Sequence, residues 1–117
     1  MKAFKRIGLI GRSGHHEAIE TITRLLEHLR AQSLEVWLED DLADHGEFAG
    51  LPHCALEHIG QKIDLAVVVG GDGSLLGASR ALARFDTPVL GVNRGTLGFL
   101  TDIRPHEVIE KIDQALN

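Results

Sequence analysis

The stretch VVVGGDGSLLGASR, Val67–Arg80, contains the signals that decide the fold of this chain. It continues a β-branched, uncharged run, Leu65–Val69, which predicts a buried strand that ends at glycine. Beyond the glycines, apolar and small residues recur at helical spacing. They predict a helix that begins near Ser74 and ends near Phe85, with an inner face of Leu75, Ala78, Ser79 and Leu82. The stretch therefore predicts a strand, a glycine-rich loop and a helix in succession.

The same alternation extends in both directions from this stretch. Short apolar runs predict further strands at Ile7–Ile10, Leu34–Leu38 and Val89–Val92. A first helix is predicted from one apolar stripe of Ala18, Ile19, Ile22, Leu25, Leu26 and Leu29. A final helix is predicted from Pro105 onward, with Val108, Ile109, Ile112 and Leu116 on its apolar face. The acidic segment Glu39–Gln61 has no clear period, and we expect an irregular connection there with one short helical turn.

Strands that are apolar throughout and alternate with helices predict a mostly parallel sheet covered on both faces. The expected fold class is α/β, a three-layer Rossmann-like or flavodoxin-like domain. Ligands of such domains bind outside the carboxyl ends of the strands. Three glycine-bearing loops are expected to meet at that edge: GRSG, GGDGS and GVNRGTLGF.

Composition restricts the classes of function. The chain has 117 residues, 44% of them hydrophobic and 25% charged, which is typical of one soluble globular domain. A net charge of −5 argues against a nucleic-acid partner. The single cysteine, Cys54, excludes an internal disulfide and a Cys-rich zinc site. The N-terminus does not resemble a signal peptide and no apolar run could span a membrane, so we expect a cytoplasmic protein without a membrane partner.

The GGDGS loop has the features of a phosphate-binding site, and also those of an ordinary turn. Gly71 and Gly73 would allow a ligand to approach the backbone closely, and a following helix would direct its N-terminal N–H groups towards a phosphate. Ser74 either caps that helix or donates its hydroxyl to a phosphate. Asp72 is either a turn residue or a site residue, and the spacing alone leaves both open. Neither the GxxxxGK[ST] nor the GxGxxG pattern is present.

GGDGSLLGASR followed by GVNRGTLGFLTD resembles the amino-terminal domain of NAD kinases, which phosphorylate the adenosine ribose 2′-hydroxyl of NAD. The resemblance covers nearly the whole chain, from the GLIGR strand to the TDIRPHE segment. Diacylglycerol kinases, sphingosine kinases and phosphofructokinases share the GGDG loop. The second motif, NRGTLGF at Asn93–Phe99, separates the NAD kinases from them. The resemblance implies the amino-terminal domain of a GGDG-superfamily kinase.

The resemblance also implies roles for individual residues. Asp72 would be the catalytic base that receives the ribose hydroxyl proton. Phe99 would form an apolar wall against the nucleotide, with Leu76 nearby. The remaining nucleotide-binding candidates are Gly71, Gly73, Ser74, Asn93 and Gly95, with Arg12 and Arg80 reaching phosphate oxygens unless they are ordinary surface arginines. The scattered histidines show no metal-ligand spacing, so no protein-bound metal is predicted.

By the same resemblance the substrates are ATP and NAD, with a divalent cation such as Mg²⁺, and the full-length enzyme is a homo-oligomer. NAD kinases continue into a β-rich domain that completes the NAD site, so we expect residues 1–117 to be one domain of a longer enzyme and inactive alone. Two alternatives stay open. One is a lipid or sugar kinase of the same superfamily. The other is a non-catalytic nucleotide-binding α/β module that uses Asp40–Asp41 as an acidic pocket.

Overall fold

The computed structural model describes residues 4–11, 16–43, 48, 50–70, 72–93, 109–110 and 113–114. The strands are β1 (Arg6–Ile10), β2 (Glu35–Glu39), β3 (His53–Cys54), β4 (Leu65–Gly70) and β5 (Val89–Asn93). The helices are α1 (His16–Ala31), α2 (Asp40–Ala43), α3 (Leu56–Ile59) and α4 (Asp72–Ala83). Within these ranges no helix is long and apolar enough to cross a membrane.

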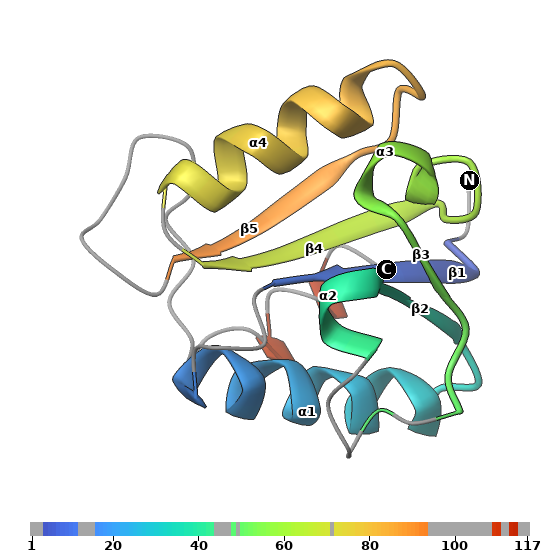
Figure 1. The fold of residues 1–117 in the computed structure, drawn as a ribbon. Helices are drawn as coiled ribbons and strands as arrows, with labels where there is room; N and C mark the ends of the chain where they lie inside the picture. The colour runs from blue at the N-terminus through green and yellow to red at the C-terminus, as the bar shows by residue number, and fades with distance from the viewer. Residues whose placement is uncertain are drawn as a thin grey trace.

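The five strands form one sheet in the order β3-β2-β1-β4-β5 (Figure 1). Every pair of neighbouring strands is parallel, so all five carboxyl ends meet at one edge. From β1 the chain builds outward through β2 and β3, and then returns to add β4 and β5 on the other side. The strand order therefore reverses between β1 and β4, which is the position where parallel α/β sheets open a crevice for ligands.

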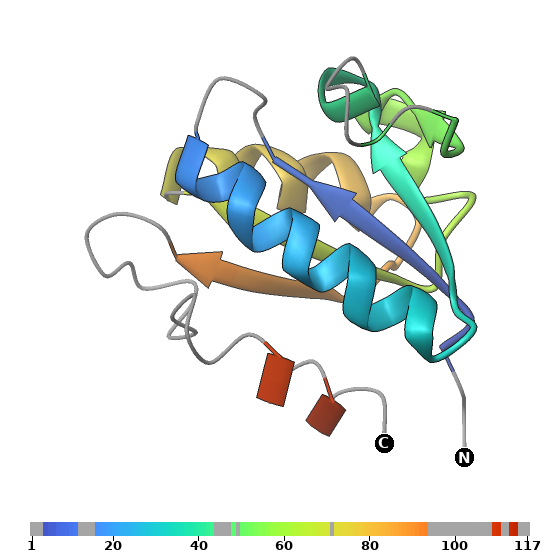
Figure 2. The ribbon, with the colours of Figure 1, turned by 90° about the horizontal axis from the view of Figure 1, so that it is seen from below.

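Side chains of the central strand β4 alternate between two cores. Leu65, Val67 and Val69 belong to the cluster formed with α1, whereas Ala66 and Val68 belong to the cluster formed with α3 and α4. Figures 1 and 2 show α1 on one face of the sheet and α4 on the other. Because both faces are covered, the strands are apolar throughout. The predicted parallel sheet with helices on both faces is confirmed.

The long helix α1 is positioned by its apolar stripe. All six residues predicted to form this stripe are buried: Ala18, Ile19, Ile22, Leu25, Leu26 and Leu29. The helix ends in a Schellman motif, in which the N–H of Leu34 donates to the carbonyl of Leu29 at 3.2 Å and that of Ser33 donates to Arg30 at 3.0 Å. Ser33 takes the left-handed position of this motif, with φ 63°. The motif turns the chain directly into β2.

Two parts of the chain differ from the prediction by more than one residue at the end of an element. The segment 39–61 contains α2, β3 and α3, and these elements have no more than four residues each, too few to show a period. Helix α4 begins at Asp72, two residues before Ser74, and ends at Ala83, so Phe85 lies in the following turn. Residues 109–110 and 113–114 are helical, in agreement with the predicted final helix, whose other residues lie outside the described part of the chain.

Candidate functional site

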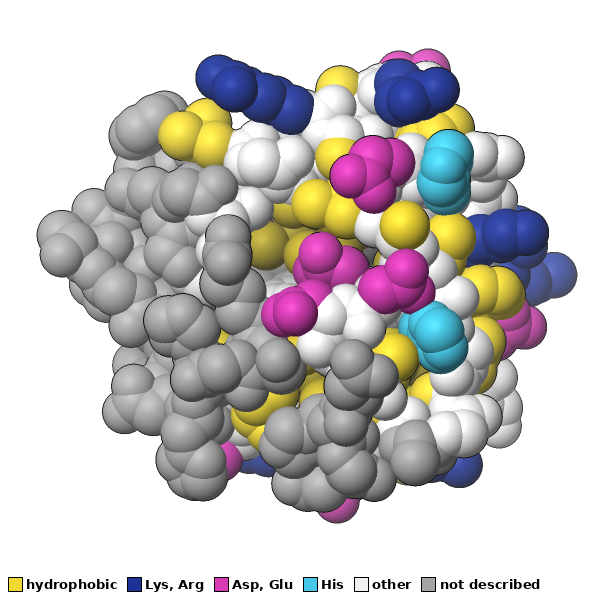
Figure 3. All heavy atoms as spheres, viewed as in Figure 1, with side chains coloured by type: hydrophobic (Ala, Val, Ile, Leu, Met, Phe, Trp, Pro, Cys, Tyr) yellow, Lys and Arg dark blue, Asp and Glu magenta, His cyan; other side chains and the backbone are white. Residues whose placement is uncertain are grey.

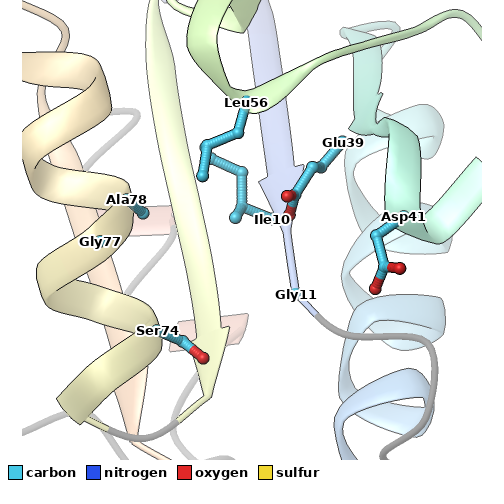
Figure 4. A pocket seen from close by; sticks show the side chains of 8 residues that line it. All are labelled: Ile10, Gly11, Glu39, Asp41, Leu56, Ser74, Gly77 and Ala78. Atoms are coloured by element: carbon cyan, nitrogen blue, oxygen red, sulfur yellow. The ribbon is translucent and has the colours of Figure 1, made fainter.

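A cavity of about 310 Å³ opens at the carboxyl edge of the sheet, where the strand order reverses (Figure 4). It is lined by Ile10, Gly11, Glu39, Asp41, Leu56, Ser74, Gly77 and Ala78. These residues come from the ends of β1 and β2, from α2 and α3, and from the first half of α4. The cavity is within the size range of small-molecule sites in proteins.

Helix α4 forms one wall of the cavity with a single face. Ser74, Gly77 and Ala78 are three and four positions apart, so they lie on the same side of the helix. Ile10 and Leu56 supply apolar surface beside Ala78, while Glu39 and Asp41 supply carboxylates. In Figure 3 acidic side chains gather beside a hollow with hydrophobic surface in the middle of this face. The cavity thus has an apolar wall on one side and an acidic wall on the other.

Ser74 lies in the first turn of α4 rather than before it, so capping of the helix from outside by Ser74, one of the two predicted roles, does not fit the structure. A Cβ atom added to Gly70 would lie 3.0 Å from Cβ and 3.1 Å from Oγ of Ser74. A glycine at this strand end therefore allows close approach of the first turn of α4. That turn brings the hydroxyl of Ser74 to the cavity.

The GGDG and NRGTLGF motifs begin at the ends of two neighbouring strands, β4 and β5. In the β4–β5 ladder the Cα of Gly70 is paired with that of Asn93, so the first residues of the GGDG and NRGTLGF motifs lie side by side at the ends of these strands. Asp72 and Gly73 are the first two residues of α4. Their backbone is described, and so is that of Asn93, but their side-chain environments are not. The topology therefore brings the two motifs to one edge, as the sequence predicted.

Other predicted site residues are placed differently or not at all. Leu76 is 39% exposed and does not line the cavity, and Arg80 is exposed further along α4. Gly71, Gly95, Phe99 and Arg12 lie outside the described residues.

Of the eight residues that line the cavity, only Ser74 was predicted as a nucleotide-binding candidate; the other seven are Ile10, Gly11, Glu39, Asp41, Leu56, Gly77 and Ala78. For Glu39 a signal was present, because the last residue of a parallel strand faces the ligand-binding edge. Of the pair Asp40–Asp41, only Asp41 lines the cavity. Asp40 instead forms a hydrogen bond of 2.7 Å between its Oδ1 and Nδ1 of His53. Nowhere in the described ranges do three or more His, Cys, Asp or Glu side chains group in a way that could hold a metal ion.

Comparison with known proteins agrees with this geometry. A solved structure of yeast NADH kinase, complexed with NADH, has the same fold, with a TM-score of 0.79 and 23% sequence identity over 99% of this chain and 38% of that chain. NAD kinases of Pseudomonas putida (strain GB-1) and Pseudomonas aeruginosa (strain LESB58) are 52% and 51% identical over all 117 residues. The chain spans 40% of the length of each of these two relatives. The family model described as the ATP-NAD kinase N-terminal domain matches residues 7–117. With a match of this extent, the chain belongs to the NAD kinase family.

Proposed function

We propose that the protein to which this chain belongs transfers the γ-phosphate of ATP to the 2′-hydroxyl of the adenosine ribose of NAD, giving NADP. The observation that carries this proposal is the cavity at the reversal of strand order, next to the first turn of α4 and the GGDG segment. The relatives named NAD kinase support the choice of reaction. Because the chain spans 40% of their length, the reaction is a property of the whole protein.

In the proposed reaction Asp72 orients the ribose hydroxyl and accepts its proton. An ordinary aspartate has a pKa of about 3.9, so it is a weak base at neutral pH. A loose phosphoryl-transfer transition state needs little prior removal of the proton. Asp72 then takes the proton late, as the bond from the ribose oxygen to phosphorus forms. Its place at the start of α4 puts it beside the helix N-terminus, where anionic phosphate is favoured.

The remaining candidates divide between the two substrates. Leu76 and Phe99 would contact NAD, while Gly71, Gly73 and Ser74 would lie against the transferred phosphate. Asn93 and Gly95 would shape the turn that faces them, and Arg12 and Arg80 would contact phosphate oxygens. This division is consistent with α4, in which Ser74 lines the cavity and Leu76 does not.

A divalent cation such as Mg²⁺ would neutralise charge on the transferring phosphoryl group. Mg²⁺ is commonly bound through substrate phosphates with few protein ligands, so the cation would enter with the ATP phosphates. We further propose that the full-length enzyme works in the cytoplasm as a homo-oligomer, with nucleotides as its small-molecule partners.

The test is an activity assay of the full-length gene product. We expect NADP to form from NAD and ATP in the presence of Mg²⁺, detected with an NADP-specific dehydrogenase. Diacylglycerol, sphingosine and fructose 6-phosphate serve as competing acceptors. Phosphorylation of one of them without NADP formation would replace the proposal with another kinase of the same superfamily. No phosphoryl transfer to any acceptor would favour a binding module.

A further inference from the structure

Gly77 is a glycine that the packing of the described residues does not require. It lies in the middle of α4, is exposed, and a Cβ atom added there would meet no atom within 4 Å apart from its chain neighbours and the adjacent backbone of α4. At Gly60, by contrast, an added Cβ would overlap the ring of Phe85. Glycine destabilises a helix interior relative to alanine. The chain therefore carries an unfavourable residue at a position where a larger one would fit.

The space that Gly77 leaves open belongs to the cavity. Gly77 lines it between Ser74 and Ala78, with Ile10 and Leu56 nearby (Figure 4). This end of the cavity is bounded by the bare helix backbone and by aliphatic side chains. Such a surface suits a flat, mostly apolar group that approaches the helix closely.

We infer that Gly77 is a specificity-determining residue, whose missing side chain leaves room for the nucleobase of the phosphate donor to lie against α4. This inference rests on the proposed function, because it names the part of ATP that occupies the cavity. The triphosphate extends from there towards Ser74 and the start of α4.

Two features support this orientation of ATP: the positive end of the α4 dipole, and the side of α4 on which Leu76 lies. The N-terminus of α4 attracts phosphate, which favours a triphosphate at the Ser74 end of the cavity. Leu76, the candidate contact for NAD, follows Ser74 by two positions and precedes Gly77 by one, so it is turned away from the cavity face of the helix. The first turns of α4 thus separate a donor side from an acceptor side.

The test uses Gly77→Ala and Gly77→Val in the full-length protein. A methyl or isopropyl group fits the folded chain but occupies the place of the base. We expect the KM for ATP to rise several-fold in G77A and about tenfold or more in G77V, since overfilling a packed contact has effects of this order. The KM for NAD should stay within about twofold. The melting temperature of the protein without ligand should not fall, because both residues are better helix formers than glycine.

A second measurement distinguishes the contribution of the base to binding from that of the phosphates, and it does not depend on turnover. ATP and inorganic tripolyphosphate, which has no base, are compared as stabilising ligands in thermal melts. We expect ATP to stabilise the wild-type protein more than tripolyphosphate does. In G77V the advantage of ATP should disappear, while the effect of tripolyphosphate is retained.

Ala83→Gly is the matched control, because it alters helix stability at an exposed position of α4 that does not line the cavity. It should lower the melting temperature and leave both KM values unchanged. The inference is overturned if G77V raises the KM for NAD instead, changes neither KM, or lowers the melting temperature. Absence of NADP formation by the wild type would count against the proposed function alone, because the ligand melts still test the role of Gly77.

Discussion

His28 in α1 and Asp113 are joined by a hydrogen bond of 2.7 Å between Nε2 and Oδ1, across 85 positions of the sequence. Gln32, in the turn that follows α1, donates from Nε2 to the same carboxylate oxygen at 3.2 Å. These bonds tie α1 to a helical segment beside it, visible in Figure 2. The bond from His28 is the largest cause that lowers the pKa of the Asp113 carboxyl below its ordinary value, although burial acts in the opposite sense.

The lowered pKa of Asp113 predicts a pH dependence of stability. A carboxyl whose folded pKa is depressed stabilises the fold above its unfolded pKa, and this contribution is lost as pH falls through the folded pKa. Asp113→Asn should therefore lower the free energy of unfolding at pH 7 and have little effect once the pH is below the folded pKa of Asp113. Because the pair is partly exposed, the loss should not exceed about 1 kcal/mol. Denaturant unfolding at several pH values measures it, with Glu110→Gln as control. A loss of the same size below the folded pKa of Asp113 and at pH 7 would contradict the prediction.

The left-handed residue at the end of α1 predicts a stabilising substitution. Ser33 has φ 63°, a region that glycine adopts without steric cost. Ser33→Gly should raise the free energy of unfolding by about 0.5–1 kcal/mol, since relief of strain is partly offset by the greater freedom of the unfolded chain. Ser33→Ala keeps the strain and should give no gain. Chemical denaturation of the two variants distinguishes them, and equal stability of both would show that the backbone at this turn is unstrained.

For the adjacent leucines Leu75 and Leu76 of α4, substitution by alanine is expected to affect different properties, stability for Leu75 and NAD binding for Leu76. Leu75 is 5% exposed in the core beneath α4, whereas Leu76 is 39% exposed. Leu75→Ala should lower the free energy of unfolding by about 2–5 kcal/mol through loss of buried apolar contact. Leu76→Ala should change it by less than about 0.5 kcal/mol but raise the KM for NAD about tenfold. Steady-state kinetics and melts of the full-length enzyme check both, and a normal KM in L76A would remove Leu76 from the acceptor site.

The role proposed for Asp72 predicts a loss confined to turnover. Asp72→Asn in the full-length enzyme should lower kcat by about 10²–10⁴-fold, because the amide cannot take the proton. The KM for NAD should change little. Asp86→Asn is the control, since asparagine tolerates the left-handed backbone of that turn, where φ is 55°. Equal losses through kcat and KM in D72N would indicate a binding role, and a normal kcat would rule out proton acceptance.

The sequence by itself determined the layers of the fold and the edge at which the site lies. The apolar runs that became β1, β2, β4 and β5 and the apolar stripe of α1 could be recognised in the sequence, because each is long enough to bury one whole face or both. The motifs after β4 and β5 could be expected to meet, since parallel strands end at one edge. Resemblance to a family then indicated the chemistry.

Only the tertiary structure determined which residues line the cavity. Asp41 and Leu56 belong to a segment of one-turn helices and a two-residue strand, whose positions come from packing on β2 and α4 rather than from any local pattern. The sequence alone does not distinguish Gly77 from any other glycine in a helix. Its significance depends on two facts of the folded chain: an added Cβ would meet no atom apart from the adjacent backbone of α4, and the open space beside it is the cavity. Periodicity reports which side of an element is buried, but only the arrangement of several elements determines where space is left between them.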